Sequence, residues 1–165
     1  MVVVVAVVVV LVVAIAAVAA VLILAVAPLL LPLAAARAER VVFAAYITQE
    51  PRLNASTGAT VLFGGVITNI GSAFNPATSV FTAPYHGQYV FFVRVDISKD
   101  CFGVDFRRNG QRVAAANNDG YVSSHVNAGV ALTLKAGDTV TVTFFSSQGY
   151  VDAGIESVFT GFRVA

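Results

Sequence analysis

Few residues of this sequence could form a catalytic centre. His86 and His125 are the only histidines, and we expect both of them in loops. Ser124, His125 and Asp119 have the residue types of a nucleophile–base–acid triad, but nearness in sequence does not create triad geometry. The sequence has no histidine–cysteine cluster for zinc and no Gly-Lys-Ser/Thr motif for a nucleotide phosphate. We therefore expect a protein that is not an enzyme and that has no cofactor.

Polar and aromatic residues in three segments that we expect to be loops could instead bind a ligand. A tyrosine ring can stack on a sugar face while Asn and Asp side chains hydrogen-bond the hydroxyl groups. The candidate contacts are Arg52, Asn117, Asn118, Asp119, Tyr121, Gln148, Tyr150 and Asp152. Asn54 begins an Asn-Ala-Ser sequon and is a candidate glycosylation site. The alternative for each of these positions is an ordinary solvated loop.

An apolar N-terminal segment indicates the cellular compartment of these loops. No charged residue occurs between Val2 and Ala36, and such a run exceeds the roughly 20 residues that cross a bilayer as a helix. Two prolines followed by small residues favour a cleaved signal peptide, whereas the length of the run and the missing positive charge before it favour a retained anchor. We expect an apolar leader helix at 1–38 and an extracellular domain at 39–165. The protein would then be secreted, or membrane-anchored if the leader is uncleaved.

The charges and the single cysteine limit the classes of partner. Lys and Arg number 10 against 9 Asp and Glu, without a basic stripe, so we expect no nucleic-acid partner. Cys101 is the only cysteine, which rules out an intrachain disulfide. We expect it to be a buried apolar side chain, the alternative being an intermolecular disulfide. A small extracellular domain without disulfides needs another source of stability, and burial in an oligomer is one.

Short strands are the elements that must position these residues, because apolar and polar residues alternate with period two and no helical period occurs after the leader. The expected strands are 41–48, 60–69 (interrupted by Gly64-Gly65), 79–83, 88–98, 102–107, 111–116, one with Val130, Leu132 and Leu134 inward, one with Val140, Val142 and Phe144 inward and Thr139, Thr141 and Thr143 outward, and 158–164. This spacing predicts an antiparallel sandwich, and alternation alone does not decide between a jelly roll and an immunoglobulin-like form.

Two of these strands are apolar on both faces. Such a pattern predicts that the strand at 41–48 is central in its sheet or covered by a neighbouring subunit. The strand at 88–98 has the apolar Val90 and Phe92 on the face that later carries Arg94 and Asp96. We expect it to begin deep in the sandwich and to finish near the surface.

The stretch from Phe63 to Val93 carries a specific pattern, and through it the chain resembles the C1q globular domain. The matching residues, at the spacings of that family's signature, are Phe63, Asn69, Phe74, Phe81, Gly87, Tyr89 and Phe91, with Val93 in place of the final aromatic residue. Val42–Tyr46, Leu134–Asp138 and Phe159–Phe162 are similar to the family's first strand, late turn and closing strand. The resemblance covers about residues 40–165.

The resemblance implies an all-β, ten-stranded jelly roll shared with tumour necrosis factor-like proteins, and a homotrimer. It implies a secreted binding module that recognises microbial glycans or other surface patterns in innate immunity. The alternatives are a trimeric ligand for a cell-surface receptor and a structural head in an extracellular matrix, and the lack of a Gly-X-Y stalk argues against the last. Some members bind calcium through acidic loops, but the corresponding region, Asn117–Asn127, has Asp119 as its only carboxylate.

Overall fold

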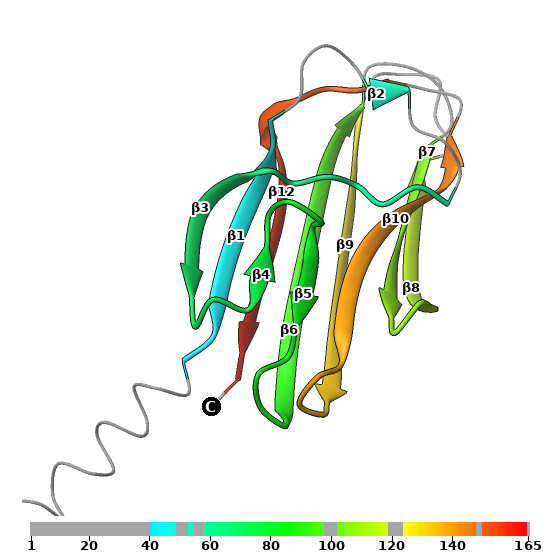
Figure 1. Cartoon of the computed structure of the whole chain (residues 1–165). Coiled ribbons are helices and arrows are strands. Elements are labelled where there is room, and N and C mark those ends of the chain that lie inside the picture. Colours follow the sequence, from blue (N-terminus) through cyan, green and yellow to red (C-terminus); the bar gives the residue numbers. More distant parts are fainter. Residues whose placement is uncertain are drawn as a thin grey trace, which may run out of the picture. The chain divides into compact units, whose positions relative to one another are not determined.

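The computed structural model describes residues 40–48, 53–54, 58–97, 102–118, 124–147 and 150–164. These residues form twelve strands in two antiparallel sheets that pack face to face (Figure 1). The leader predicted at 1–38 and Cys101 lie outside the described residues. Within the described part of the chain, no helix is long and apolar enough to span a membrane.

The larger sheet contains seven strands. Their order is β2-β11-β6-β12-β1-β3, and β9 also pairs with β6. The strands are β1 (Val42–Ile47), β2 (Leu53–Asn54), β3 (Gly65–Ile70), β6 (Gly87–Ile97), β9 (Ser124–Leu134), β11 (Tyr150–Val151) and β12 (Gly154–Arg163). Strand β1 lies between β12 and β3, which confirms the prediction that the first strand is central in its sheet.

The smaller sheet contains five strands in the order β4-β5-β10-β7-β8. They are β4 (Phe74–Asn75), β5 (Val80–Thr82), β7 (Phe102–Arg108), β8 (Gln111–Asn118) and β10 (Thr139–Ser147). In both sheets strands that are distant in sequence pair with one another, such as β1 with β12 and β5 with β10, as in a jelly roll. The predicted hairpin at Asn109-Gly110 is present between β7 and β8, and both residues have the positive φ that this turn requires.

An aromatic cluster fills the space between the two sheets. The Phe43 ring lies 4.6 Å from the Phe74 ring, in a stacked arrangement, and 4.8 Å from the Phe159 ring, edge to face. The Phe81 ring lies edge to face against Phe91, at 5.1 Å. All five rings are at most 3% exposed. Because β1, β6 and β12 come from the larger sheet and β4 and β5 from the smaller one, these contacts hold the sheets together.

The remaining signature residues support this core. The Asn69 side chain donates to the Phe74 carbonyl (2.8 Å) and accepts from the Phe74 N–H (3.3 Å), so it ties β3 to β4. A Cβ atom at Gly87 would lie 2.7 Å from Nε of Arg163, so a side chain there would displace this guanidinium. Val93, the departure from the signature, is 2% exposed and fills its core position as an apolar side chain.

Several strands extend into segments that the sequence predicted as loops. The segments that are strand instead are Leu53–Asn54, Asn117–Asn118, Ser124–His125, Ser146–Ser147 and Tyr150–Val151, and the last strand starts at Gly154 rather than Val158. Where a strand ends in polar residues, apolar and polar side chains no longer alternate, so the sequence pattern gives too early an end. Backbone pairing with the neighbouring strand continues regardless of side chain. The predicted strand at 60–69 is also shorter, because the chain crosses between the sheets before Gly65: the Val61 N–H still donates to the Val142 carbonyl of the smaller sheet (2.9 Å).

Two strand faces differ from the simplest expectation, and for one of them the predicted face is wrong. Thr143 lies on the outer face as predicted, yet it is 5% exposed because its hydroxyl bonds a buried carboxylate. Strand β6 was expected to begin deep in the sandwich, yet Phe92 is 52% exposed on the outer face of the larger sheet. The first difference comes from a polar cluster on the outer face of the smaller sheet. The second comes from an apolar outer face that the single chain leaves uncovered.

Candidate functional site

Three connections between the sheets begin and end at the same end of the sandwich. In the larger sheet, Ile97 pairs with both Ser124 and Val151. In the smaller sheet, Phe102 pairs with both Asn118 and Ser147. The chain therefore passes from β6 to β7, from β8 to β9 and from β10 to β11 at one end, which we call the loop end (Figure 1). The turn at 135–138, the Asn109-Gly110 turn and the C-terminal end of β12 lie at the opposite end.

The fold brings part of the predicted ligand-binding set together at the loop end. Asn54 and Tyr150 are direct partners in the β2–β11 ladder, although 96 positions separate their numbers in the sequence. Asp152 follows β11 directly and is half-buried. Asn117 and Asn118 end β8 in the other sheet, where they pair with Gly103 and Phe102, and the Asn117 side chain is exposed. Arg52, Asp119, Tyr121 and Gln148 lie outside the described residues.

A chain of hydrogen bonds fixes the segment that follows β11. The buried Ser157 hydroxyl donates to the Asp152 carbonyl (3.0 Å) and accepts from the Asp96 N–H (2.9 Å). The Asp152 N–H in turn donates to the Asp96 carbonyl (3.1 Å). These bonds use the backbone of Asp152, so they hold this position against β6 and β12 independently of its carboxylate. Sequence reasoning missed Ser157, and no motif marks it, because its role depends on β6, β12 and the connection that follows β11.

Of the residues with triad types, Asp119 lies outside the described residues. His125 lies in β9, not in a loop, and its direct strand partner is Asp96 of β6. His86 is exposed beside the start of β6, and its carbonyl accepts from the Arg163 guanidinium (3.2 Å). Among the described residues, no three or more His, Cys, Asp or Glu side chains are grouped so that they could hold a metal ion.

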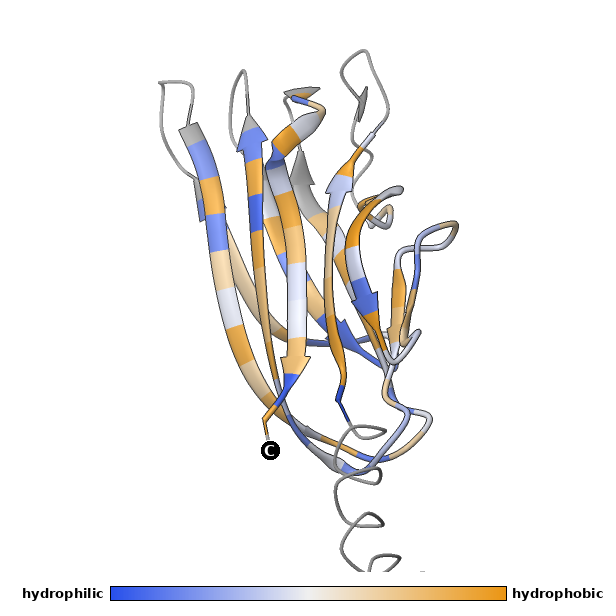
Figure 2. Cartoon of the chain, turned by 90° about the vertical axis from the view of Figure 1, so that its left-hand side faces the viewer, coloured by the Kyte–Doolittle hydropathy of each residue, from blue (hydrophilic) through white to orange (hydrophobic). Residues whose placement is uncertain are grey.

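The outer face of the larger sheet is apolar and partly open. Phe92 (52% exposed) and Phe162 (37%) project from it beside half-buried valines. Figure 2, which faces this sheet, shows hydrophobic residues along most of its long strands and hydrophilic residues nearer the loop end. A groove of about 350 Å³ lies on this face between β9, β6 and β12, lined by Phe92, Val93, Arg94, Asn127, Ala128, Gly129, Val158 and Thr160. The apolar Val90 and Phe92 in the β6 sequence were the signal for this surface, although their pattern predicted a strand that begins deep in the sandwich.

The outer face of the smaller sheet carries a different feature, a buried carboxylate. The Asp105 side chain is fully buried, and Arg107 (32% exposed) and Arg112 (50%) lie against it. Burial alone would raise the pKa of the Asp105 carboxyl, but hydrogen bonds from Thr143, Arg107 and Arg112 outweigh burial and hold that pKa below its usual value. The carboxylate therefore stays ionised. Alternation of Asp105 with Val104 and Phe106 indicated only an outward side chain and did not reveal the cluster.

Comparison with known proteins places this chain in a family. The family model of the C1q domain matches residues 42–164. A subunit of the complement C1q subcomponent from Mus musculus is 35% identical over 117 residues, which cover 70% of this chain and 46% of that protein. The chain therefore spans about half the length of that relative.

Solved structures with the same fold come from two groups of proteins. The globular domain of zebrafish complement 1qA has a TM-score of 0.63 at 20% identity and covers 76% of this chain and 98% of its own. Eiger TNF from S. frugiperda has a TM-score of 0.64 at 14% identity, covering 77% and 94%, and murine APRIL 0.62 at 13%, covering 76% and 99%. These structures confirm the predicted all-β jelly roll, and the family model together with the mouse relative confirms the predicted resemblance. The chain belongs to the C1q domain family.

Proposed function

We propose that this chain is an extracellular, trimeric recognition module that binds surface ligands through its loop end. The observation that carries the proposal is the convergence of three connections from two sheets at one end of a rigid sandwich. Segments that are distant in sequence can contact one ligand there, and a rigid scaffold lowers the cost of ordering them. The relationship to a mouse complement C1q protein supports a role in innate immunity and an extracellular location.

The apolar outer face of the larger sheet supports assembly into a trimer. Exposed phenylalanines around an open groove are unusual on a monomer, and a second copy of the chain would cover them. Assembly also explains how weak sites could act together. Three loop ends on one rigid trimer would gain avidity through effective concentration, without requiring a strong single site.

We propose microbial glycans as the ligand class. Tyr121 and Tyr150 would stack on sugar faces, while Asn117, Asn118 and Asp119 would hydrogen-bond hydroxyl groups. The β2–β11 ladder supports the inclusion of Tyr150, because it holds this residue at the loop end, opposite Asn54. Arg52, Gln148 and Asp152 complete the proposed contact set. A glycan on the Asn54 sequon would then lie at the loop end, and a mass shift after glycosidase treatment of the exported protein checks whether the sequon is used.

A glycan array probed with the exported protein tests this function. We expect binding to microbial glycans that Tyr121→Ala and Tyr150→Ala each reduce by about fivefold to tenfold, as expected for the loss of an aromatic contact. Tyr85→Ala is the matched control, because Tyr85 is an exposed tyrosine outside the loop end, beside Arg163. Glycan binding that survives both loop-end substitutions, or that falls equally in the control, would contradict the proposed site.

A trimeric ligand for a cell-surface receptor is the second candidate function. It is favoured by the TM-scores to Eiger TNF (0.64) and APRIL (0.62), which are similar to the score of 0.63 to the complement 1qA domain. Fold similarity at this sequence identity does not fix function, so identifying the ligand is what distinguishes the two candidate functions. Saturable binding to one cell-surface protein that persists after enzymatic removal of cell-surface glycans would favour the receptor ligand over the glycan-binding module.

A further inference from the structure

A fully buried carboxylate on the outer face of a sheet is unexpected. Asp105 alternates with the core residues Val104 and Phe106, so its side chain leaves the sandwich, and yet its exposed fraction is zero. Two arginines from neighbouring positions cover it. Arg107 is two residues along β7, and Arg112 is the direct partner of Arg107 in β8.

The hydrogen bonds of Asp105 leave its two oxygens fully used. Oδ1 accepts from Arg107 Nε (3.2 Å) and from the Thr143 hydroxyl. Oδ2 accepts from Arg107 Nη2 (3.2 Å) and from Arg112 Nε (2.6 Å). A carboxylate has about four lone-pair sites, and all four are occupied here. One negative charge therefore holds two guanidinium groups in place and neutralises only one of them.

The arginines are fixed, but they still face solvent. Arg107 is also held by the Thr143 hydroxyl (2.9 Å) and the Gly110 carbonyl (3.3 Å), so contacts from three segments define its position. About a third of its side chain and half of that of Arg112 remain exposed. Ordered arginines bind an anion with less loss of side-chain entropy than free ones. The buried carboxylate thus pre-organises a positive surface.

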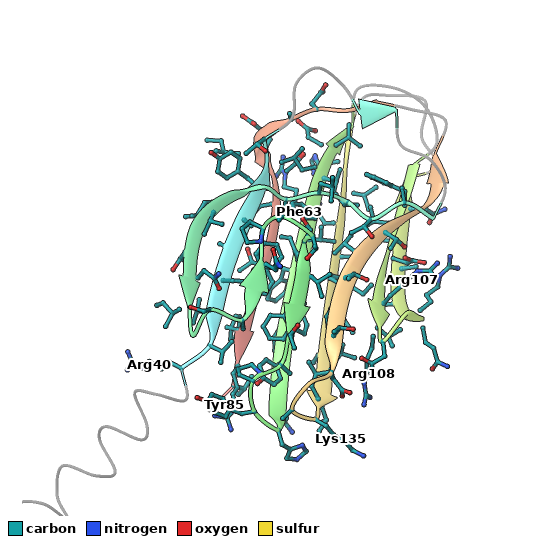
Figure 3. All side chains as sticks on the ribbon, in the orientation of Figure 1. Arg40, Phe63, Tyr85, Arg107, Arg108 and Lys135 are labelled. Atoms are coloured by element: carbon teal, nitrogen blue, oxygen red, sulfur yellow. The ribbon has the colours of Figure 1, made fainter. Side chains whose placement is uncertain are left out.

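More positive charge lies nearby on the same side of the sandwich. Arg108 bonds Asp138 (2.8 Å), and Lys135 belongs to the same turn as Asp138. Figure 3 shows Arg107, Arg108 and Lys135 along this side, away from the loop end. Four basic residues thus meet two acidic ones, which gives this surface a formal net charge of +2. The exposed residues of β8 and the half-buried Thr141 of β10, which pairs with Arg107, leave a broad strand face beside the arginines.

We propose that the outer face of the smaller sheet, centred on Arg107 and Arg112, is a binding site for an acidic polysaccharide that carries sulfate or carboxylate groups. The exposed parts of the two guanidinium groups attract such anions by charge. The repetition of these anions along a polymer lets one chain contact the arginine pair and the Arg108–Lys135 corner together. This site goes beyond the glycan-binding role proposed for the loop end, because it uses different residues and recognises charge rather than sugar faces.

Dextran sulfate and uncharged dextran are the matched probes for this site. We expect the full exported protein, immobilised on a biosensor in about 0.15 M NaCl, to bind dextran sulfate and not dextran. Arg112→Gln should weaken binding about fivefold to tenfold and lower the slope of log affinity against log salt by about one. Arg107→Gln should weaken it by at least as much, and circular dichroism verifies that both variants fold.

Arg40→Gln is the control, because Arg40 is exposed, carries the same charge and precedes β1 in the other sheet. It should leave dextran sulfate affinity within about twofold, since a distant exposed charge contributes little at this salt concentration. Absence of dextran sulfate binding, or an equal loss in Arg40→Gln, would overturn the proposal. Equally tight binding of a DNA duplex that Arg112→Gln abolishes would also overturn it. The loop-end proposal is tested separately, by the effect of Tyr150→Ala on binding to uncharged glycans. Its failure would not change the result expected for dextran sulfate.

Discussion

At the residue scale, the phenylalanine core is where stability is most concentrated. Phe43 touches the rings of four other phenylalanines, from both sheets, and has no exposed surface. A cavity at this position would remove contacts across the sandwich, and the surrounding rings can close it only partly.

We therefore expect Phe43→Ala to lower the free energy of unfolding by about 3–5 kcal/mol. Chemical denaturation of the purified protein measures this loss. Ile155→Ala is the comparison, because Ile155 is 70% exposed, and it should change stability by no more than about 0.5 kcal/mol. Similar losses in the two variants would mean that the aromatic cluster is not the main core.

Asp105 makes stability depend on pH on the acid side. Its pKa is lower in the folded than in the unfolded protein, so its contribution is fully present above the unfolded value and is lost as the pH falls. We expect the free energy of unfolding to decrease between about pH 5 and pH 2. Asp105→Asn should reduce this decrease, and should lower stability at neutral pH by about 1–3 kcal/mol because two guanidinium groups lose bonds.

Urea denaturation at several pH values, with wild type and Asp105→Asn side by side, measures both effects. The comparison depends on the difference between the two pH profiles, since other carboxyl groups titrate in both proteins. Parallel profiles would show that Asp105 does not contribute to acid sensitivity.

At the element scale, close approach of β12 to the core depends on a glycine. A Cβ atom at Gly161 would lie 2.5 Å from the Phe43 ring and 2.6 Å from the Phe91 ring, and both rings are fully buried. We expect Gly161→Ala to destabilise the protein by about 1–3 kcal/mol through overpacking. Thermal or chemical denaturation measures the loss.

Gly64→Ala is the matched control for this substitution. Its Cβ atom would meet only the Thr48 side chain at close range, 2.7 Å from the hydroxyl oxygen, and Thr48 is exposed and can rotate away. We expect a change of less than about 0.5 kcal/mol there. Equal effects at both glycines would indicate a backbone cause rather than close packing against Phe43 and Phe91.

At the scale of the whole molecule, the apolar outer face of the larger sheet should govern assembly. Phe92→Lys places a charge on a side chain that is half exposed in the single chain, so folding should be preserved. In a trimer built on this face, the same lysine would be buried without a partner. We expect light scattering to show a trimer for wild type and a monomer for Phe92→Lys at micromolar concentration.

Val113→Lys provides the comparison, because Val113 is also an exposed apolar residue (39%), on β8 of the other sheet. It should leave the trimer intact. A wild-type monomer, or a trimer that persists in Phe92→Lys, would show that this face is not the assembly surface, and a monomeric wild type would remove the avidity mechanism as well.

Much of the fold could be predicted from the sequence, because the relevant signals are local. Period-two alternation identified most strands and the inward side of β10, where Val140, Val142 and Phe144 are buried. The Asn109-Gly110 pair identified a hairpin. The spacing of seven signature residues identified the family, because those residues fill the core or tie its strands together. Strand ends were predicted less well, since polar side chains at Asn117 or Tyr150 carry no alternation and only backbone pairing extends the strands.

The functional surfaces were decided by tertiary structure. The sequence by itself named polar candidates such as Asn54 and Tyr150, but only the pairing of β2 with β11 made them neighbours. It recorded that Phe92 is apolar, but only the packing of the sheets left that side chain outside. It showed an aspartate and two arginines near a turn, but burial of Asp105 required Thr143 from β10. The physical reason is the same in each case: strand alternation is set by adjacent residues, whereas strand order and exposure are set by hydrogen bonds and packing between segments that lie far apart in the chain.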